Sequence, residues 1–318
     1  MYKIVSSSPT FGKYSNKPVT YLEKEHCSVT ILEPGVADDE EKFAEALKDC
    51  DALIVGVEKV TRKVLEGAKS LKVIAKHGAG VDNIDLLAAK ERNIPVAFAP
   101  GANRHAVADL ALGLMLSLAR DIPSAHQEVS NGEWPRVIGT ELFGKTLGVI
   151  GTGKIGKEVI QRAKGFSMNI LALDPFPDSE LMASGVQYVS KDTLISTSDF
   201  ITIHTDLNEG SRNLFDWNAF RNMKKTSYLI NTARGGIVDE EALYEALKAG
   251  EIAGAALDVF LREPANTSPL LTLGNFIATP HMAGYTTEAL EEVGLITARN
   301  IINVLNGKRA EYEWKVPV

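Results

Sequence analysis

Three predicted strands in the second half of the sequence lead to polar residues whose types could do chemistry together, Arg234, Glu263 and His281. The planar guanidinium of an arginine can engage a carboxylate and an adjacent carbonyl at a fixed orientation. A histidine can give a proton to such a carbonyl near neutral pH, and a neighbouring carboxylate keeps the imidazolium oriented. The set therefore suits the reduction of a 2-oxo acid by hydride.

A glycine-rich segment supplies the place where a hydride carrier would bind. Residues 146–156 have the sequence TLGVIGTGKIG, a predicted strand that leads into GxGxxG and then into a helix. Gly151 permits the tight turn, Gly153 lets the backbone approach a pyrophosphate, and Gly156 lets helix and strand pack closely. Lys154 and Ile155 begin the helix, whose N-terminus offers unpaired N–H groups to an anion. We expect these five residues to bind a dinucleotide.

The acidic residue Asp174 predicts which dinucleotide binds. It ends the next strand, where a carboxylate accepts hydrogen bonds from the adenosine ribose. A carboxylate at this place repels the 2′-phosphate of NADP, and residues 175–180 contain no Lys or Arg to reverse that preference. We therefore expect NAD as the cofactor. Residues that end or follow later strands, His204, Thr205 and Ala233, are further candidates for cofactor contact.

Short apolar runs alternate with helical patterns along the chain, which is typical of parallel sheets covered by helices. One series of predicted strands comprises 3–6, 29–32, 52–57, 72–76 and 96–98, with helices such as 38–47 and 84–91 between them. A second series comprises 146–150, 170–174, 200–205, 227–232, 253–258 and 276–279, and a helix at 287–305 follows it. We expect an α/β protein with two parallel-sheet domains, Rossmann-like or flavodoxin-like.

The second series lies in mid-chain, which predicts an inserted domain. The cofactor domain, residues 101–285, would interrupt a substrate domain built from residues 1–100 and 286–318. The two crossings, near Pro100 and Ala283, would form a hinge around a cleft that closes on the substrate.

The helix after Pro100 and the segment that follows it indicate a second subunit. Up to Arg120 this helix is apolar on nearly every face, so we expect it to be buried between two bodies. Residues 121–144 have the pattern of an irregular arm with too little core to stand alone. We expect the arm to lie across the partner in a homodimer.

Composition argues against several other classes of protein. The net charge of −7 and the lack of a basic run disfavour nucleic-acid binding. The N-terminus lacks a signal-peptide pattern, and the longest apolar stretch, 107–119, is too short to span a bilayer. Cys27 and Cys50 have no CxxC or CxxH context, so neither a disulfide framework nor a metal site is expected. We expect a cytoplasmic enzyme with no metal, membrane or nucleic-acid partner.

Five motifs, in order and spacing, resemble those of the D-isomer-specific 2-hydroxyacid dehydrogenases: GTGKIG, Asp174-Pro175, NTARGGIVDEEAL, AGAALDVFLREP and ATPHMAG. The resemblance implies an NAD-dependent oxidoreductase that interconverts a small 2-oxo acid and its D-2-hydroxy acid. It also implies that Arg234 binds the substrate and polarises its carbonyl, that Glu263 pairs with the histidine, and that His281 transfers the proton. Asp258 would hold the nicotinamide carboxamide.

The resemblance leaves two candidate substrates. Residues 77–83 resemble the family's carboxylate-binding loop, in which Ala79 and Gly80 would turn their N–H groups to the substrate and His77 would line the loop. Segments 138–148 and 233–263 resemble phosphoglycerate dehydrogenases in particular. A phosphorylated substrate needs extra cations, and the candidates are Lys76, Arg104 and Arg136. We expect 3-phosphoglycerate first and glyoxylate or hydroxypyruvate as the alternative.

A binding module is the alternative from another class, because corepressors that resemble these dehydrogenases use the fold to sense NAD(H). Such proteins typically carry added tails or peptide-docking surfaces, which this sequence does not show. Formate dehydrogenases share the fold but differ where Glu263 and Pro264 stand. Two positions depart from the family pattern. Asp109 shortens a side chain that is more often Glu, and Tyr285 predicts a narrower mouth of the site.

Overall fold

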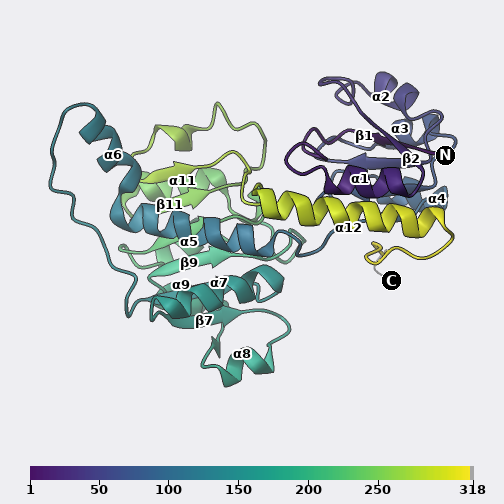
Figure 1. Ribbon diagram of the computed structural model, residues 1–318. Coiled ribbons are helices and arrows are strands. Elements are labelled where there is room, and N and C mark those ends of the chain that lie inside the picture. Colours follow the sequence, from purple (N-terminus) through teal and green to yellow (C-terminus); the bar gives the residue numbers. More distant parts are fainter. Residues whose placement is uncertain (316–318) are drawn as a thin grey trace. The chain divides into compact units, whose positions relative to one another are not determined.

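The computed structural model describes residues 1–315, and the chain divides into two compact units (Figure 1). Unit 1 comprises Met1–Asn103 and the chain from Tyr285 onward, and unit 2 comprises Arg104–Gly284. Each unit is built on its own parallel sheet, and unit 2 interrupts the sequence of unit 1. The predicted fold class is thus confirmed.

Unit 1 has a five-stranded parallel sheet in the order β2-β1-β3-β4-β5. Its strands are β1 (Tyr2–Ser6), β2 (Cys27–Ile31), β3 (Ala52–Val55), β4 (Val73–Lys76) and β5 (Val96–Ala97). The central strands β3 and β4 are buried at every position, because helices cover both faces of the sheet. This strand order is that of flavodoxin-like folds.

Two groups of helices form the two cores of unit 1. One face packs against α1 (Lys17–Lys24) and α12 (Thr287–Leu305), which lie side by side in Figure 1. The other face packs against α2 (Glu40–Ala46), α3 (Arg62–Gly67) and α4 (Leu86–Glu91). Side-chain caps begin the helices of this second layer. For example, Asp85 accepts a hydrogen bond from the N–H of Ala88 at the start of α4.

The C-terminal tail returns to the edge of the unit 1 sheet. Trp314 N–H donates to the carbonyl of Val96 in β5 (2.8 Å), and Phe98 N–H donates to the carbonyl of Tyr312 (3.1 Å). The buried side chain of Asn300 in α12 bonds both to Phe98 and to the tail. The last helix and the tail are therefore integral to unit 1.

Unit 2 has a seven-stranded parallel sheet in the order β12-β11-β10-β9-β6-β7-β8. Its strands are β6 (Thr146–Ile150), β7 (Asn169–Leu173), β8 (Gln187–Tyr188), β9 (Phe200–Ile203), β10 (Tyr228–Asn231), β11 (Gly254–Leu257) and β12 (Phe276–Ala278). The order reverses between β6 and β9, as in Rossmann folds. Ligands bind at such a switch point, beyond the carboxyl ends of the strands.

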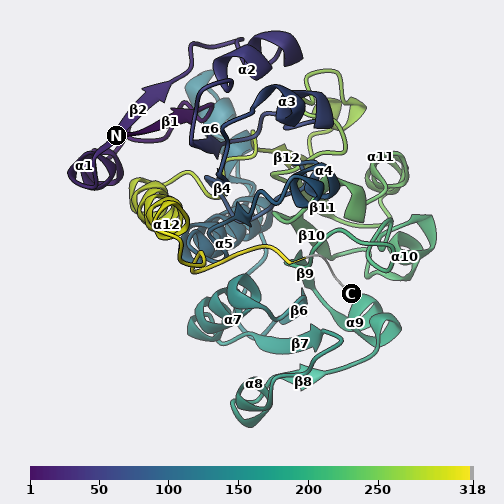
Figure 2. The same ribbon diagram turned by 90° about the vertical axis from the view of Figure 1, so that its right-hand side faces the viewer.

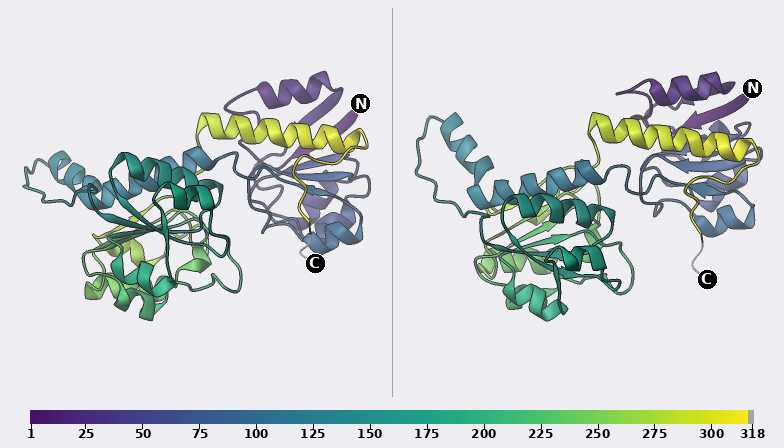
Figure 3. Two further views of the ribbon diagram at one scale, coloured as in Figure 1. Left: turned by 90° about the horizontal axis from the view of Figure 1, so that it is seen from below. Right: turned by 60° about the horizontal axis from the view of Figure 1, so that its bottom comes forward.

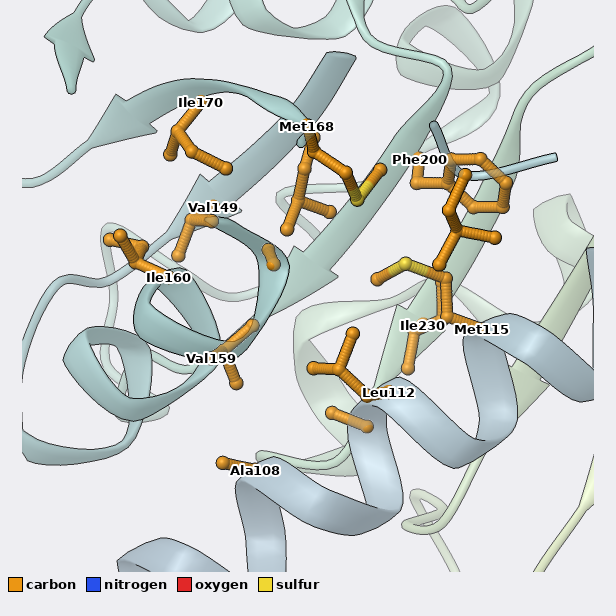
Figure 4. Close-up of a cluster of buried hydrophobic side chains, with 14 of the residues drawn as sticks. Ala108, Leu112, Met115, Val149, Val159, Ile160, Met168, Ile170, Phe200 and Ile230 are labelled. Atoms are coloured by element: carbon orange, nitrogen blue, oxygen red, sulfur yellow. The ribbon is translucent and has the colours of Figure 1, made fainter. Parts of the chain in front are cut away.

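Helices cover both faces of this sheet (Figure 2). One layer consists of α5 (Arg104–Arg120) and α7 (Lys154–Gly165), and the other of α9 (Lys191–Thr197), α10 (Trp217–Asn222) and α11 (Glu240–Ala249). In the first layer Leu112 and Met115 of α5 lie close to Phe200 and Ile230 of the sheet (Figure 4). The smaller elements are α6 (Ile122–Ser130), α8 (Ser179–Ala183), η1 (Gly235–Ile237) and η2 (Pro269–Thr272).

The segment after α5 differs from the irregular arm expected for residues 121–144. Ile122–Ser130 forms the helix α6, because Pro123 stands in the first turn, where a missing N–H costs nothing. Only the part beyond α6 is irregular, and the whole segment extends away from the rest of unit 2 (Figure 3). Most apolar residues of α5 pack inside unit 2, while Asp109 and Gly113 are exposed. Within residues 1–315, no helix combines the length and apolar character needed to cross a bilayer.

Candidate active site

The carboxyl ends of the unit 2 strands bring the predicted cofactor and acid–base residues to one edge of the sheet. The glycine loop follows β6, Asp174 follows β7, Arg234 stands three residues after the end of β10, and His281 stands three residues after the end of β12. All these strands are parallel, so their carboxyl ends point the same way. The fold therefore assembles residues that are far apart in the sequence.

A different structural reason accounts for glycine at each of the three loop positions. Gly151 has a φ of +88°, and a Cβ there would lie 2.5 Å from the carbonyl oxygen of His204 at the end of β9. A Cβ on Gly156 would overlap the carbonyl oxygen of Gly151. Gly153, the N-cap of α7, has open space in front of it. Lys154 and Ile155 begin that helix, as the sequence predicted. The N-terminus of α7 therefore faces the open space in front of Gly153.

A chain of hydrogen bonds fixes Asp174. Thr152 donates to its Oδ2 from both the backbone N–H (2.7 Å) and the side-chain hydroxyl (3.2 Å). The Thr152 hydroxyl also lies 2.8 Å from the Tyr188 hydroxyl, which accepts from the N–H of Asp178 (3.0 Å). Because the Thr152 hydroxyl has one proton and donates it to Asp174, the Tyr188 phenol is the donor to Thr152. These hydrogen bonds thus hold the Asp174 carboxylate in place beside the glycine loop.

Two buried polar atoms near this edge have no hydrogen-bond partner among the described residues, His204 Nδ1 and Thr232 Oγ1. The other ring nitrogen of His204 lies 2.8 Å from the Thr202 hydroxyl, and burial lowers the pKa of His204 to about 3. His204 is therefore a neutral residue whose ring lies inside the fold, and its backbone packs on Gly151. Thr205 follows it, and Ala233 N–H is bonded to Asn231.

These features fit NAD. The open surface at Gly153 suits a pyrophosphate, and the fixed carboxylate of Asp174 suits ribose hydroxyls. The unpaired hydroxyl of Thr232, at the end of β10, offers a polar contact beside them.

Glu263 and His281 form a direct pair. The Nδ1 atom of His281 lies 2.7 Å from Oε2 of Glu263, and both side chains are partly exposed. The other carboxylate oxygen of Glu263 accepts from the N–H of Phe260 (2.9 Å). Because Nδ1 faces the carboxylate, Nε2 is the nitrogen that remains for a substrate.

The buried carboxylate of Asp258 holds the turn that carries His281. It accepts from the Thr279 hydroxyl (2.6 Å) and from the N–H groups of Met282 (2.8 Å) and Ala283 (2.9 Å). His281 itself has a φ of +52°, a left-handed conformation that is uncommon for a residue with a side chain. Asp258 thus supports this turn, and its predicted contact with a nicotinamide carboxamide remains a prediction.

Arg234 lies in an equally constrained turn. The buried side chain of Asn231 accepts from Ala233 N–H (2.9 Å) and donates to the Arg234 carbonyl (2.8 Å), closing the turn after β10. A Cβ on Gly235 would overlap the peptide that joins Phe260 to Leu261. The turn of Arg234 is therefore packed against the segment that carries Glu263.

The predicted substrate-binding residues of unit 1 lie at the carboxyl end of β4. The ammonium of Lys76 donates to the Gly56 carbonyl and to Asn83 Oδ1, the latter at 2.8 Å. The Nδ1 atom of His77 lies 3.2 Å from the Ser8 hydroxyl, and burial lowers the pKa of His77 to about 4. Both side chains thus bond within unit 1 and support the loop. Ala79 and Gly80, farther along that loop, are half-buried.

The two arginines proposed for phosphate differ in setting. Arg104, the first residue of α5, donates from Nε to Glu158 (3.3 Å), a carboxylate that also binds Arg162 (2.8 Å). The Nε atom of Arg162 donates to Asp109 at 2.6 Å. Asp109, which departs from the family pattern, therefore takes part in the ion-pair network between α5 and α7. Arg136 is exposed on the segment after α6.

Residues 112–283, more than half of the chain, match the family model described as the NAD-binding domain of D-isomer-specific 2-hydroxyacid dehydrogenases. The chain belongs to this family. The resemblance found in the sequence motifs and the expected cofactor, NAD, are thereby confirmed.

Relatives within the family are named for different substrates. A D-3-phosphoglycerate dehydrogenase from Methanocaldococcus jannaschii is 48% identical over 87% of this chain and 54% of its own length. A hydroxypyruvate reductase from Thermotoga maritima is 43% identical over 84% of this chain and 89% of its own. The chain spans about half the length of the first phosphoglycerate dehydrogenases that it matches. Among solved structures, apo D-lactate dehydrogenase from Escherichia coli is 34% identical with a TM-score of 0.89, covering 99% of this chain and all of that one.

Several residues of this family member's site were missed from sequence. Tyr188, Thr279 and Asn231 act through hydrogen bonds whose partners lie up to 36 positions away. Only Asn231 carried a signal, since a buried amide that ends a strand before an arginine indicates a closed turn.

Proposed function

We propose that this protein interconverts a small 2-oxo acid and its D-2-hydroxy acid with NAD(H). The observation that carries the proposal is the His281–Glu263 pair, 2.7 Å apart, on the same sheet edge as the glycine loop. A proton donor and a dinucleotide loop at one edge are what reduction of a carbonyl requires.

Each residue then has a defined task. Bound NADH supplies the hydride. The Nε2 atom of His281 gives its proton to the carbonyl oxygen as negative charge develops there, and takes it back from the hydroxyl in the opposite direction. Glu263 holds the imidazole through Nδ1, and Arg234 binds the substrate carboxylate and polarises the carbonyl. In unit 1, the N–H groups of Ala79 and Gly80 are the proposed carboxylate ligands.

For the substrate we propose an unphosphorylated acid of the hydroxypyruvate or glyoxylate class. Two of the three cations considered for a phosphate, Lys76 and Arg104, are bonded to acceptors inside their own units. Moving either one to a phosphate would break those bonds, and for Lys76 it would leave the buried Gly56 carbonyl with the Asn83 amide as its remaining donor. The hydroxypyruvate reductase that is 43% identical supports the same choice. The second candidate, 3-phosphohydroxypyruvate, is favoured by the 48% identity to a phosphoglycerate dehydrogenase.

The deciding experiment follows NADH absorbance with glyoxylate, hydroxypyruvate, 3-phosphohydroxypyruvate and pyruvate. We expect the highest kcat/KM with hydroxypyruvate or glyoxylate, and a preference for 3-phosphohydroxypyruvate would reverse the substrate choice. His281→Ala should lose turnover and keep NADH binding, measured by nucleotide fluorescence. Arg234→Ala should raise KM and lower kcat together. Protein that binds NADH but reduces none of the acids would be a sensing module and not a dehydrogenase.

We also propose a homodimer formed through the segment from α6 to β6. Large apolar side chains in this segment are exposed: Ile122, Val129, Trp134, Val137, Ile138 and Phe143. Trp134 is 87% exposed and Ile138 95%. A patch of this kind on one segment is typical of a surface that a partner covers. Light scattering should give twice the chain mass, and Trp134→Ser with Ile138→Ser should give the monomer.

A further inference from the structure

Glu240, the first residue of α11, directs its carboxylate away from its own helix. Its Oε1 accepts a hydrogen bond from the backbone N–H of Leu261 at 2.5 Å. An acidic side chain in a first helical turn ordinarily interacts with the N–H groups of that turn. Here Asp239 performs that task by accepting from Glu241 N–H and Ala242 N–H. Glu240 is therefore available to bind a segment 21 positions away.

The surroundings of Glu240 disfavour the ionised form of its carboxyl group. Burial raises its pKa, and the nearby charges of Glu263 and Asp239 raise it too, against the lowering effect of the bond to Leu261 N–H. A carboxylate placed against these penalties, beside a second acid, needs a compensating gain from what it holds.

What Glu240 holds is the segment on which the candidate active site converges. The N–H of Phe260 orients Glu263, whose other oxygen pairs with His281. The peptide that joins Phe260 to Leu261 packs on Gly235, next to Arg234. Two consecutive peptide units, 259–260 and 260–261, thus contact the two arms of the site, and Glu240 binds the N–H of the second one.

We propose that Glu240 is a positioning residue for proton transfer: by binding Leu261 N–H it fixes the 260–263 turn and so places Glu263 against His281. The inference rests on the proposed function for its kinetic consequences, but not for its structural ones. Without the bond, the turn would be held by the packing of Gly235 and Phe260 and by the Phe260–Glu263 hydrogen bond. The Glu263 carboxylate would then lie within hydrogen-bonding distance of the imidazole less often.

The test compares Glu240→Ala, Glu240→Gln and the control Glu241→Ala. The control removes the same charge from the next position of α11, which is exposed. In the glutamine variant the amide oxygen can still accept from Leu261 N–H. We expect Glu240→Ala to lower kcat by about tenfold, the effect of losing one hydrogen bond to a charged group, with KM for NADH unchanged. Glu240→Gln should stay within about threefold of the parent at neutral pH, because it keeps the bond.

One readout does not require turnover. Hydrogen exchange at the Leu261 amide should accelerate in Glu240→Ala and stay slow in Glu240→Gln.

The outcomes separate the two proposals. Glu240→Ala with parental kcat and parental Leu261 exchange would overturn the positioning role. Equal losses in Glu240→Ala and Glu241→Ala would assign the effect to charge or helix stability, which also overturns it. If the parent enzyme reduces no 2-oxo acid, the proposed function fails, and the exchange measurement still decides whether Glu240 holds the 260–263 turn.

Discussion

The main-chain N–H of His281 donates to the main-chain carbonyl of Asp258 at 2.9 Å, and the side chain of Asp258 accepts from the two amides that follow His281. A buried aspartate and the proposed proton donor are thus parts of one turn. The left-handed conformation of His281 is maintained by this network and not by local preference.

Asp258→Asn should therefore loosen the turn without changing the size of the side chain. An asparagine amide has one acceptor oxygen, whereas a carboxylate has two. The NH2 group of the asparagine in the variant would therefore face at least one of the donors that bond to Asp258 in the parent protein. We expect the free energy of unfolding of unit 2 to fall by about 1–3 kcal/mol and kcat to fall with it. Urea unfolding measures the first effect. Asp192→Asn, on the exposed side of α9, is the control, and an equal loss in both variants would contradict the prediction.

Acid should destabilise unit 1 through His77. Burial lowers the pKa of His77 to about 4, well below the value of about 6.5 in an unfolded chain. Between these values the unfolded chain binds the extra proton, so stability is complete above about pH 6.5 and falls as the pH drops toward 4. The slope should reach about 1.4 kcal/mol per pH unit for this group. His77→Gln should flatten the dependence measured by denaturant unfolding at pH 7 and pH 5. His126→Gln, at an exposed position, should leave it unchanged.

The same argument applies to unit 2 through His204, whose pKa burial lowers to about 3. Its contribution is lost over the pH range from about 6.5 down toward 3. We expect His204→Asn to reduce the acid sensitivity of unit 2 and not that of unit 1. Hydrogen exchange at pH 5, resolved by segment, distinguishes the two units, and protection lost equally in both would be the opposing result.

Tyr188→Phe should weaken NADH binding although Tyr188 has no predicted contact with the nucleotide. Removing the phenol leaves the Thr152 hydroxyl without its donor and Asp178 N–H without its acceptor. We expect the Kd for NADH to rise by about three- to tenfold and the preference over NADPH to narrow. Fluorescence titration with both nucleotides measures this. Tyr244→Phe, on α11, serves as control, and unchanged affinities in Tyr188→Phe would show that Asp174 is fixed by other means.

Gly235→Ala should damage both stability and turnover. The added Cβ would overlap backbone atoms of Phe260 and Leu261, and backbone cannot move aside as a flexible side chain can. We expect a loss of about 1–3 kcal/mol in unfolding free energy, with lower kcat/KM. At the neighbouring Gly236 a Cβ would lie 3.3 Å from the end of the Leu207 side chain, so Gly236→Ala is the matched control. Similar behaviour of the two variants in thermal unfolding would refute the argument.

Much of the fold was predictable, because the apolar pattern of the strands and the turn residues that flank them indicate the same elements. Strand β3 is a continuous apolar run, β4 is apolar up to its last residue, Lys76, and the helix from Thr287 to Leu305 has the predicted bounds. The helix α1 was missed because it has only eight residues, a run too short for its helical period to be distinctive. The strand β8 has two residues and exists only through its pairing with β7.

The candidate site was predictable to the extent that its residues stand next to strand ends. Arg234, Asp174 and His281 have that property, and the sheet brings them to one edge. Glu240 does not, because nothing at the start of α11 indicates that its carboxylate binds Leu261. Lys76 shows the converse, since a lysine at a strand end suggests a ligand contact whereas its ammonium bonds to Asn83. The hydrogen-bond partner of a polar side chain is a neighbour in the fold, and it can be far away in the sequence.

The return of the chain to unit 1 has a consequence for how the protein is made. One core of unit 1 includes Ala298, Ile301 and Ile302, so it stays open until α12 has left the ribosome. Unit 2, by contrast, is one continuous stretch and can close as soon as Gly284 emerges. Synthesis from the N-terminus therefore lets the second unit fold first, while the strands of the first wait for α12.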